Sequence, residues 1–121
     1  MKRDMDLVRQ IMLNVEDMPV GPPLQYRVGE VEDRVLLAHM EMLIAAGLVA
    51  GKISQSLGAR GDVIIISGLT WEGHEWLETV RNDDVWANVK EILVGQGGAM
   101  TYELTKAVAG QLLRRRLGLP G

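Results

Sequence analysis

The stretch from Val31 to Gly51 constrains the fold of this chain more than any other segment. Its apolar residues recur at the spacing of an α-helix, which predicts a central helix from about residue 29 or 30 to Ala46. Gly47 can adopt a positive φ and end this helix, and the residues from 48 onward continue as an extended segment. The apolar face of this helix is so wide that we expect it to be nearly all buried, and it comprises Val35, Leu36, Ala38, Met40, Met42, Leu43, Ile44 and Ala46.

Two strands joined by a short hairpin are predicted directly after this helix. Residues 48–55 and 62–69 are the strand candidates, and the second contains three consecutive isoleucines, which favour extended backbone. The intervening residues 56–61 include two glycines and Arg60, and they are predicted to form the tip of the hairpin. A helix that ends in Gly-Leu-Val and leads into such a hairpin is typical of the recognition helix and wing of a winged helix-turn-helix domain.

The rest of the chain supplies further helices around this unit. Pro22 and Pro23 leave room only for an abbreviated or irregular second helix before the central one. We therefore predict an α+β, mostly helical fold, with a winged helix-turn-helix core and two-stranded wing in residues 1–69 and a helical C-terminal extension in residues 70–121. The other predicted elements are helices at about 5–17, from 71 onward, 85–94 and 102–117, and an edge strand at 24–28.

Three tryptophans supply the largest apolar side chains of a sequence that has no phenylalanine. Trp71 and Trp76 lie in the helix that Thr70 is expected to cap, and Trp86 lies in the next helix. We expect all three to be core aromatics that join the extension to the winged helix.

The composition and the two histidines argue against a catalytic or metal site. There is no cysteine, so disulfides, thiolate metal sites and a cysteine nucleophile are excluded. Neither His39 nor His74 has a second histidine or a carboxylate at metal-ligand spacing, and we expect both to be structural, hydrogen-bonded to backbone or to a carboxylate. No apolar run of about 18 residues, the length that would span a membrane, is present. We therefore expect a cytoplasmic protein that is not an enzyme and that uses no cofactor and no metal.

Nucleic-acid binding is the function that the expected fold suggests. In a winged helix, the start of the recognition helix enters the major groove and the wing contacts phosphate or the minor groove. Arg34 could then read a guanine edge. The other cations that could hold phosphates are Lys52 and Arg60 on the wing and Arg3 and Arg9 near the N-terminus.

Acidic residues at the start of the same helix argue against this function. We expect Glu30, Glu32 and Asp33 to be exposed there, together with Leu37. Carboxylates repel DNA phosphates, although acids in a first helical turn also interact favourably with the helix dipole. The net charge of −3 gives no support to DNA binding either. As an alternative, these three acids are predicted to bind a protein partner.

Three motifs in the chain are KRDMDL, AHMEMLIAAGLVAG and LTWEGHEWLETVRNDDVW. They resemble the motifs of a family of uncharacterised small winged-helix proteins that is common in bacteria and prophages and is related to YjcQ-type proteins. The chain departs from that pattern at Met40, Ala45 and Trp76, where the family usually has leucine, glutamate and phenylalanine. The resemblance implies a winged-helix fold and, through the fold, DNA-binding or regulatory roles, but it implies no established activity.

Two functions therefore stay open from the sequence. The first is a small DNA-binding transcriptional regulator of phage or prophage type, which contacts double-stranded DNA. The second is a winged-helix interaction module, such as a phage-encoded inhibitor or adaptor, whose acidic face blocks the nucleic-acid-binding site of a protein partner.

The last predicted helix is relevant to whether the chain forms a homodimer. Its apolar face carries Leu104, Val108 and Leu112, and it either packs on its own core or pairs with a second copy, so a homodimer is a further expectation. The arginines 114–116 follow in the last turn, where they complement the helix dipole or clamp a phosphate.

Overall fold

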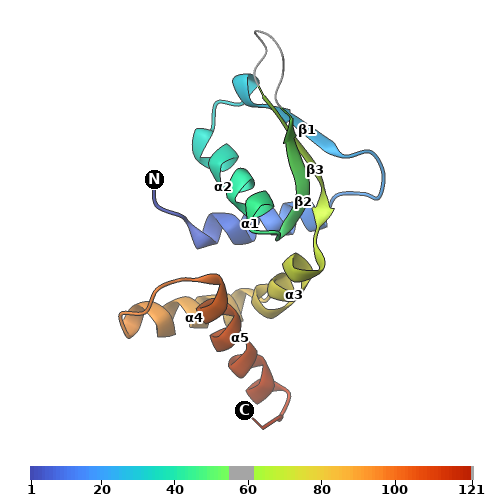
Figure 1. Cartoon of the computed structure of the whole chain (residues 1–121). Helices are drawn as coiled ribbons and strands as arrows, with labels where there is room; N and C mark the ends of the chain where they lie inside the picture. Colours follow the sequence, from blue (N-terminus) through green and yellow to red (C-terminus); the bar gives the residue numbers. More distant parts are fainter. Residues whose placement is uncertain (55–61, 121) are drawn as a thin grey trace. The chain divides into compact units, whose positions relative to one another are not determined.

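The protein folds into five α-helices, one short 3₁₀ helix and a three-stranded antiparallel sheet, counted over the residues that the structure describes. The structure is a computed structural model, and it describes residues 1–54 and 62–120. The elements shown in Figure 1 are α1 (Met5–Glu16), β1 (Leu24–Arg27), η1 (Val28–Glu30), α2 (Arg34–Ala45), β2 (Val49–Ser54), β3 (Val63–Leu69), α3 (Trp71–Val80), α4 (Asp83–Gly95) and α5 (Tyr102–Arg116). The prediction of an α+β, mostly helical fold is confirmed.

The chain divides into two compact units, Met1–His74 and Glu75–Gly121, and the division falls within α3. The first unit contains the sheet, α1, η1 and α2, and the second contains α4 and α5. Over the part of the chain that the structure describes, no helix combines the length and the apolar character that crossing a membrane requires.

The sheet of the first unit has β3 in its centre, with β1 and β2 antiparallel to it on either side. The predicted pairing of the two strands after the central helix is thereby confirmed, while the predicted hairpin tip at 56–61, which includes Arg60, lies outside the described residues. Helix α1 contacts β3 and helix α2 contacts β2, so apolar side chains of both helices and of the sheet form one core. The buried apolar residues are Met5, Val8, Ile11, Met12, Val15, Leu37, Met40, Leu43, Val49, Ile64 and Ile66.

Helix α2 begins at Arg34, about four residues later than predicted. Asp33 is its N-cap, and the Asp33 carboxylate accepts a hydrogen bond from the Leu36 backbone N–H at 3.0 Å. This cap satisfies one of the free donors of the first turn and sets the start of the helix. The preceding residues form η1, the abbreviated helix that the prolines predicted, and Gly47 ends α2 with a φ of +76° as expected.

The buried side of α2 also differs from the predicted stripe. Its buried residues are Leu37, His39, Met40 and Leu43, whereas Val35 is 47% exposed and Ala46 is exposed. The expectation that this apolar face is nearly all buried was wrong, and so was the expectation that Leu37 is exposed. Helical spacing alone did not locate the core side, because apolar residues occur all round this helix.

His39 connects the starts of the first two helices. Its ring is fully buried, and Nε2 accepts a hydrogen bond from the Asp4 backbone N–H at 2.9 Å. Because a backbone N–H can only donate, the ring proton lies on Nδ1, which donates to the Val35 carbonyl at 2.7 Å. Asp4 is itself the N-cap of α1. The predicted hydrogen bonding of His39 to backbone is confirmed, whereas His74 is exposed.

The start of α3 is held against the turn that follows α2. As predicted, Thr70 caps α3, because its hydroxyl accepts from the Gly73 N–H at 3.0 Å and also donates to the Gly47 carbonyl at 2.6 Å. Gly73 is required here because a Cβ at this position would overlap the Leu48 carbonyl. Trp71, however, is 77% exposed, so the prediction that it belongs to the core was wrong.

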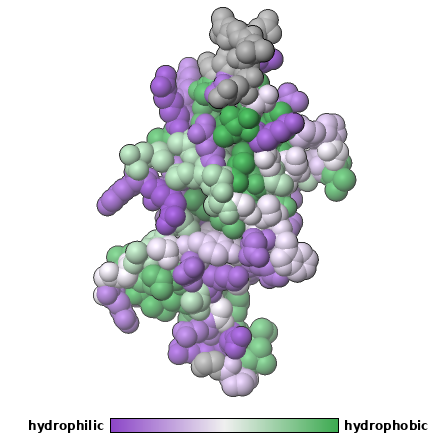
Figure 2. Space-filling model, viewed as in Figure 1, coloured by the Kyte–Doolittle hydropathy of each residue, from purple (hydrophilic) through white to green (hydrophobic). Residues whose placement is uncertain are grey.

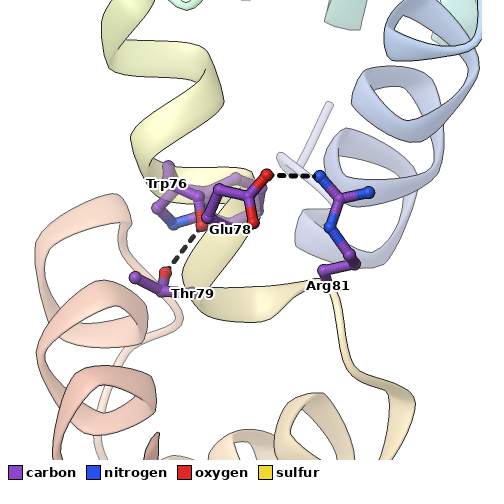
Figure 3. A network of polar contacts seen from close by, with 4 residues as sticks. All are labelled: Trp76, Glu78, Thr79 and Arg81. Carbon is purple, nitrogen blue, oxygen red and sulfur yellow. Dashed lines mark hydrogen bonds and ion pairs between the residues drawn. The ribbon is translucent and has the colours of Figure 1, made fainter.

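The second unit is built around Trp76. This side chain is fully buried; its indole N–H donates to the Thr105 hydroxyl at 3.0 Å, and its ring meets Trp86 edge-on and stacks on Tyr102. The predictions that Trp76 and Trp86 are core aromatics are confirmed. Figure 3 shows the end of α3 next to this ring, where the Thr79 hydroxyl donates to the Trp76 carbonyl at 2.6 Å.

Candidate interaction surface on helix α2

The exposed side of α2 is the first unit's candidate functional surface, because it lies at the position of the predicted recognition helix. Its residues are Arg34, Val35, Ala38, Glu41 and Ala45, and we call it the α2 face. These residues recur at spacings of three and four, opposite to the buried Leu, His and Met side chains. Four of the five are exposed and Ala38 is half-buried. The face therefore presents small and apolar side chains with one cation and one carboxylate.

The chain reaches the α2 face through three exposed acids, Glu30, Glu32 and Asp33, which we call the acidic segment. Glu30 ends η1, Glu32 lies in the link to α2, and Asp33 is the N-cap. Placing them on the first turn of the central helix was therefore an error for Glu30 and Glu32, although their predicted exposure is confirmed. Of these three carboxylates, that of Asp33 caps the helix.

A hollow of about 560 Å³ joins the acidic segment to the α2 face. Arg34 lines it together with Glu32 and Glu41, so its positive charge is accompanied by two carboxylates in the same hollow. The local charge of this surface is negative for that reason. The residues that line the hollow are Val28, Val31, Glu32, Arg34, Leu37, Ala38 and Glu41.

The cations that were predicted to bind DNA come from separate elements. Lys52 is exposed on the edge strand β2, and Arg3 is exposed just before α1, next to the Asp4–His39 hydrogen bond. Arg9 is half-buried on α1 and already takes part in an interaction within the chain. Arg60 lies outside the described residues. Of the predicted DNA contacts, only Arg34 lies on the α2 face itself.

The net charge of the whole first unit is negative, as is that of the hollow. Its sequence, residues 1–74, has seven lysines and arginines and ten aspartates and glutamates, which accounts for the net charge of −3 of the chain. The second unit is neutral in sum. Among the described residues, no group of three His, Asp or Glu side chains is arranged as metal ligands are.

A family model described as "Hypothetical protein (DUF2513)" matches residues 2–99. The chain belongs to this family. A similar protein of Haemophilus influenzae, described as an uncharacterized protein, is 30% identical over 119 residues, which cover 97% of this chain and 99% of the relative. No solved structure matches. Membership of the DUF2513 family confirms that the chain belongs to an uncharacterised family, and it assigns no activity to the α2 face.

Apart from Arg34, the sequence did not indicate the members of the α2 face, which are Val35, Ala38, Glu41 and Ala45. The signal that could have located them is the N-cap at Asp33, because a cap fixes where the helix begins. It does not by itself say which side of the helix faces the sheet. That side is set by Leu37, Met40 and Leu43, which pack into the core of the first unit.

Proposed function

We propose that this protein is a winged-helix interaction module that binds a basic surface of a partner protein through the acidic segment and the α2 face. The observation that carries the proposal is the composition of that surface, which combines the carboxylates of Glu30, Glu32 and Glu41 with a single arginine and the apolar side chains of the α2 face. An inhibitor or adaptor that covers a nucleic-acid-binding site on its partner would need such a surface, because that site is itself basic.

The order of elements in the first unit supports the winged-helix part of the proposal. Helix α1, strand β1, the short η1, helix α2 and the β2–β3 hairpin follow one another as helix, strand, helix, helix and two strands. In this scheme α2 occupies the place of the recognition helix, η1 that of the second helix, and β2 and β3 belong to the wing. Figure 1 shows these elements in the upper part of the view.

Electrostatics favours a protein over DNA as the partner of this surface. A helix that enters the major groove lies between two rows of phosphates, and each cation that contacts a phosphate adds to the affinity by releasing counterions. The α2 face offers one such cation, Arg34, and Glu41 lies two turns further along the same side. The apolar members of the face have no role in phosphate contact, whereas small apolar side chains ringed by charges are common in protein interfaces.

DNA binding by a small transcriptional regulator is the second candidate, and one specific observation favours it. Arg34 is the first residue of α2, the position from which a recognition helix reads bases, and Lys52 is exposed on a strand of the wing. The Asp4–His39 hydrogen bond also keeps Arg3 next to α2. Arg9 and Arg60 would add phosphate contacts under this hypothesis.

Fluorescence anisotropy with duplex DNA of mixed sequence separates the two candidates. We expect no salt-sensitive binding at low or physiological salt, either for the wild type or for the double variant Arg34→Ala, Arg60→Ala. Salt-sensitive binding by the wild type that the double variant loses would establish DNA as the ligand and overturn the proposal.

Photocrosslinking in cells that naturally contain the protein tests the proposal directly. A photoreactive residue replaces the exposed Ala45 on the α2 face, and the matched control replaces the exposed Ala87 on α4. We expect a protein adduct from position 45 alone, and we expect the double substitution Glu30→Lys, Glu32→Lys to abolish it. Equal adducts from the two positions, or an adduct that survives the charge reversal, would contradict the proposal.

A further inference from the structure

Helix α5 has a well-defined outer face, because the second unit fixes how the helix is rotated about its axis. The Thr105 hydroxyl accepts the indole N–H of Trp76 at 3.0 Å, and Tyr102 stacks on the same ring at a centroid distance of 6.3 Å. Thr105 and Ala109 are the buried residues of the helix. The sequence had predicted a different buried side, with Leu104, Val108 and Leu112 on the apolar face. In the structure Leu104 is 42% exposed, and Val108 and Leu112 are only half-buried.

The outer face of α5 contains a hollow of about 590 Å³ that is lined by residues of this helix alone. Its floor is formed by two small residues, Ala107 and Gly110, and no atom lies within 4 Å of the position that a Cβ would take at Gly110. Longer side chains stand at both ends of this floor. We call this surface the α5 groove, and it is lined by Tyr102, Glu103, Lys106, Ala107, Gly110, Gln111 and Arg114.

The charges of the α5 groove are arranged with opposite signs about its centre. Glu103 lies four residues before Ala107, and Arg114 lies four residues after Gly110. Both are exposed, and both lie on the side of the helix that carries the two small residues. Among the described residues of its own chain, neither is found in an ion pair. Glu103 and Arg114 therefore lie at equal distances on either side of the small-residue floor. The third charge of the lining, Lys106, lies over the Tyr102 ring, with Nζ 5.7 Å from the ring centroid.

This arrangement is self-complementary for an antiparallel second helix. A two-fold axis through the midpoint between Ala107 and Gly110 places Glu103 of each copy opposite Arg114 of the other, so that two identical ion pairs form. Ala107 of each copy then meets Gly110 of the other, and the small side chains let the two backbones approach closely. The antiparallel direction also sets the positive end of each helix dipole beside the negative end of the other.

We propose that the α5 groove is a homodimer interface, in which it binds the same groove of a second copy of this chain in antiparallel orientation. A nucleic acid is a poorer fit, because its phosphates would meet Glu103 at one end of the groove. A second copy forms ion pairs with the charges at both ends of the groove and packs against the small residues between them. Figure 2 shows hydrophilic side chains over the lower part of α5, beside a smaller hydrophobic patch. The lining of the groove contains Glu103, Lys106, Gln111 and Arg114, which agrees with an interface that forms reversibly.

The length of α5 limits the affinity that is expected for the dimer. Fifteen residues give α5 a length of roughly 22 Å. One pair of helices of this length buries less surface than the roughly 1,200 Å² of a stable interface. The dimer is therefore a weak one that exchanges with monomer at micromolar or higher concentration.

Sedimentation equilibrium over a wide concentration range, up to the millimolar, tests the interface. The single variants Glu103→Arg and Arg114→Glu each turn two attractive pairs into two repulsive ones, and each is expected to raise the dimer dissociation constant about tenfold or more. The double variant Glu103→Arg, Arg114→Glu restores both pairs in the opposite sense and is expected to dimerise like the wild type. Circular dichroism and thermal melts check that every variant is folded.

Two further samples make the result specific to this geometry. Arg115→Glu makes the same charge change at the same helix end but on another side of α5, and it should leave the dissociation constant within about twofold of the wild-type value. The two single variants, each monomeric alone, should associate when they are mixed, because a mixed pair has both ion pairs restored. A monomeric wild type at all concentrations would overturn the proposal, and so would a dimer that withstands the single reversals or one that the double variant and the mixture fail to restore.

Discussion

The two compact units of this protein are held together in different ways. In the unit of residues 1–74, a sheet and two helices share an apolar core of many medium-sized side chains, and one buried histidine bonds to backbone groups of both α1 and α2. In the unit of residues 75–121, smaller buried side chains (Leu77, Val80, Val85, Val89 and Leu93) accompany one large indole ring. That ring, of Trp76, meets Trp86 edge-on, stacks on Tyr102 and donates its N–H to Thr105.

The two units should therefore differ in which single substitutions destabilise them most. An apolar core that is spread over many residues loses only a part of its burial when one side chain is shortened. A core that depends on Trp76 loses volume, two aromatic contacts and a buried hydrogen bond in a single substitution. The second unit should therefore have the more damaging single site, and the first unit should be most sensitive at its one buried polar residue.

Trp76→Ala is the substitution with the largest expected effect. It removes the fully buried ring and leaves Tyr102 and Trp86 without their shared aromatic neighbour. We expect a loss of about 3–5 kcal/mol in the free energy of unfolding, measured by urea denaturation. Trp76→Phe is the control; it keeps an aromatic ring but removes the donor to Thr105, and its cost should be clearly smaller. Equal costs for the two variants would show that ring volume is not what holds this unit.

His39→Ala tests the corresponding site of the first unit. The variant removes the acceptor of the Asp4 N–H and the donor to the Val35 carbonyl, and it leaves a cavity, so a loss of about 2–3 kcal/mol is expected. Faster hydrogen exchange in the first turn of α1 should accompany it. The matched control is His74→Ala at an exposed position, which should cost less than about 0.5 kcal/mol. If exchange at the start of α1 does not change, the Asp4–His39 bond does not hold that helix in place.

Gly73→Ala tests the close approach at the start of α3. A methyl group at this position would overlap the Leu48 carbonyl and touch the end of the Met12 side chain, so the backbone must shift at a cost of about 1–3 kcal/mol. Gly95→Ala is the control, because no atom lies within 4 Å of the new Cβ and alanine favours a helix, which gives no loss or a small gain. Thermal melts of the two variants compare them directly. A Gly73 variant as stable as the wild type would mean that α3 is free to move away from Leu48.

Much of the fold could be predicted from the sequence, because its signals are local. The Asp4 and Thr70 caps, the end of α2 at Gly47 and the consecutive isoleucines of β3 each act within a few residues. The start of α2 could not be placed, since apolar periodicity continues upstream of Asp33 and only the cap geometry ends it. The exposure of Trp71 could not be predicted either, because large apolar residues at one face of a helix are usually buried.

The candidate surfaces were only partly visible in the sequence for a related reason. The acids at 30, 32 and 33 could be named from the sequence, but the α2 face needed the knowledge that Leu37, Met40 and Leu43 face the core. The α5 groove was missed because its residues are small or charged. It becomes apparent only after Thr105 and Ala109, rather than the leucines, are seen to be buried.

The substitution with the least expected cost breaks an exposed ion pair of the second unit, and a substitution at a buried hydrogen bond of the same unit serves as its comparison. The Arg81–Glu78 ion pair in Figure 3 has an N–O distance of 2.8 Å, shorter than the 3.0 Å bond between Trp76 and Thr105. Its side chains are 39% and 63% exposed, so water competes for both charges, and Glu78→Gln should cost no more than about 0.5 kcal/mol. Thr105→Val keeps the side-chain shape but leaves a buried indole donor without its acceptor, and we expect about 1–3 kcal/mol. If urea denaturation shows a larger loss in the free energy of unfolding for Glu78→Gln than for Thr105→Val, burial is not what makes the Trp76 site dominant in the second unit.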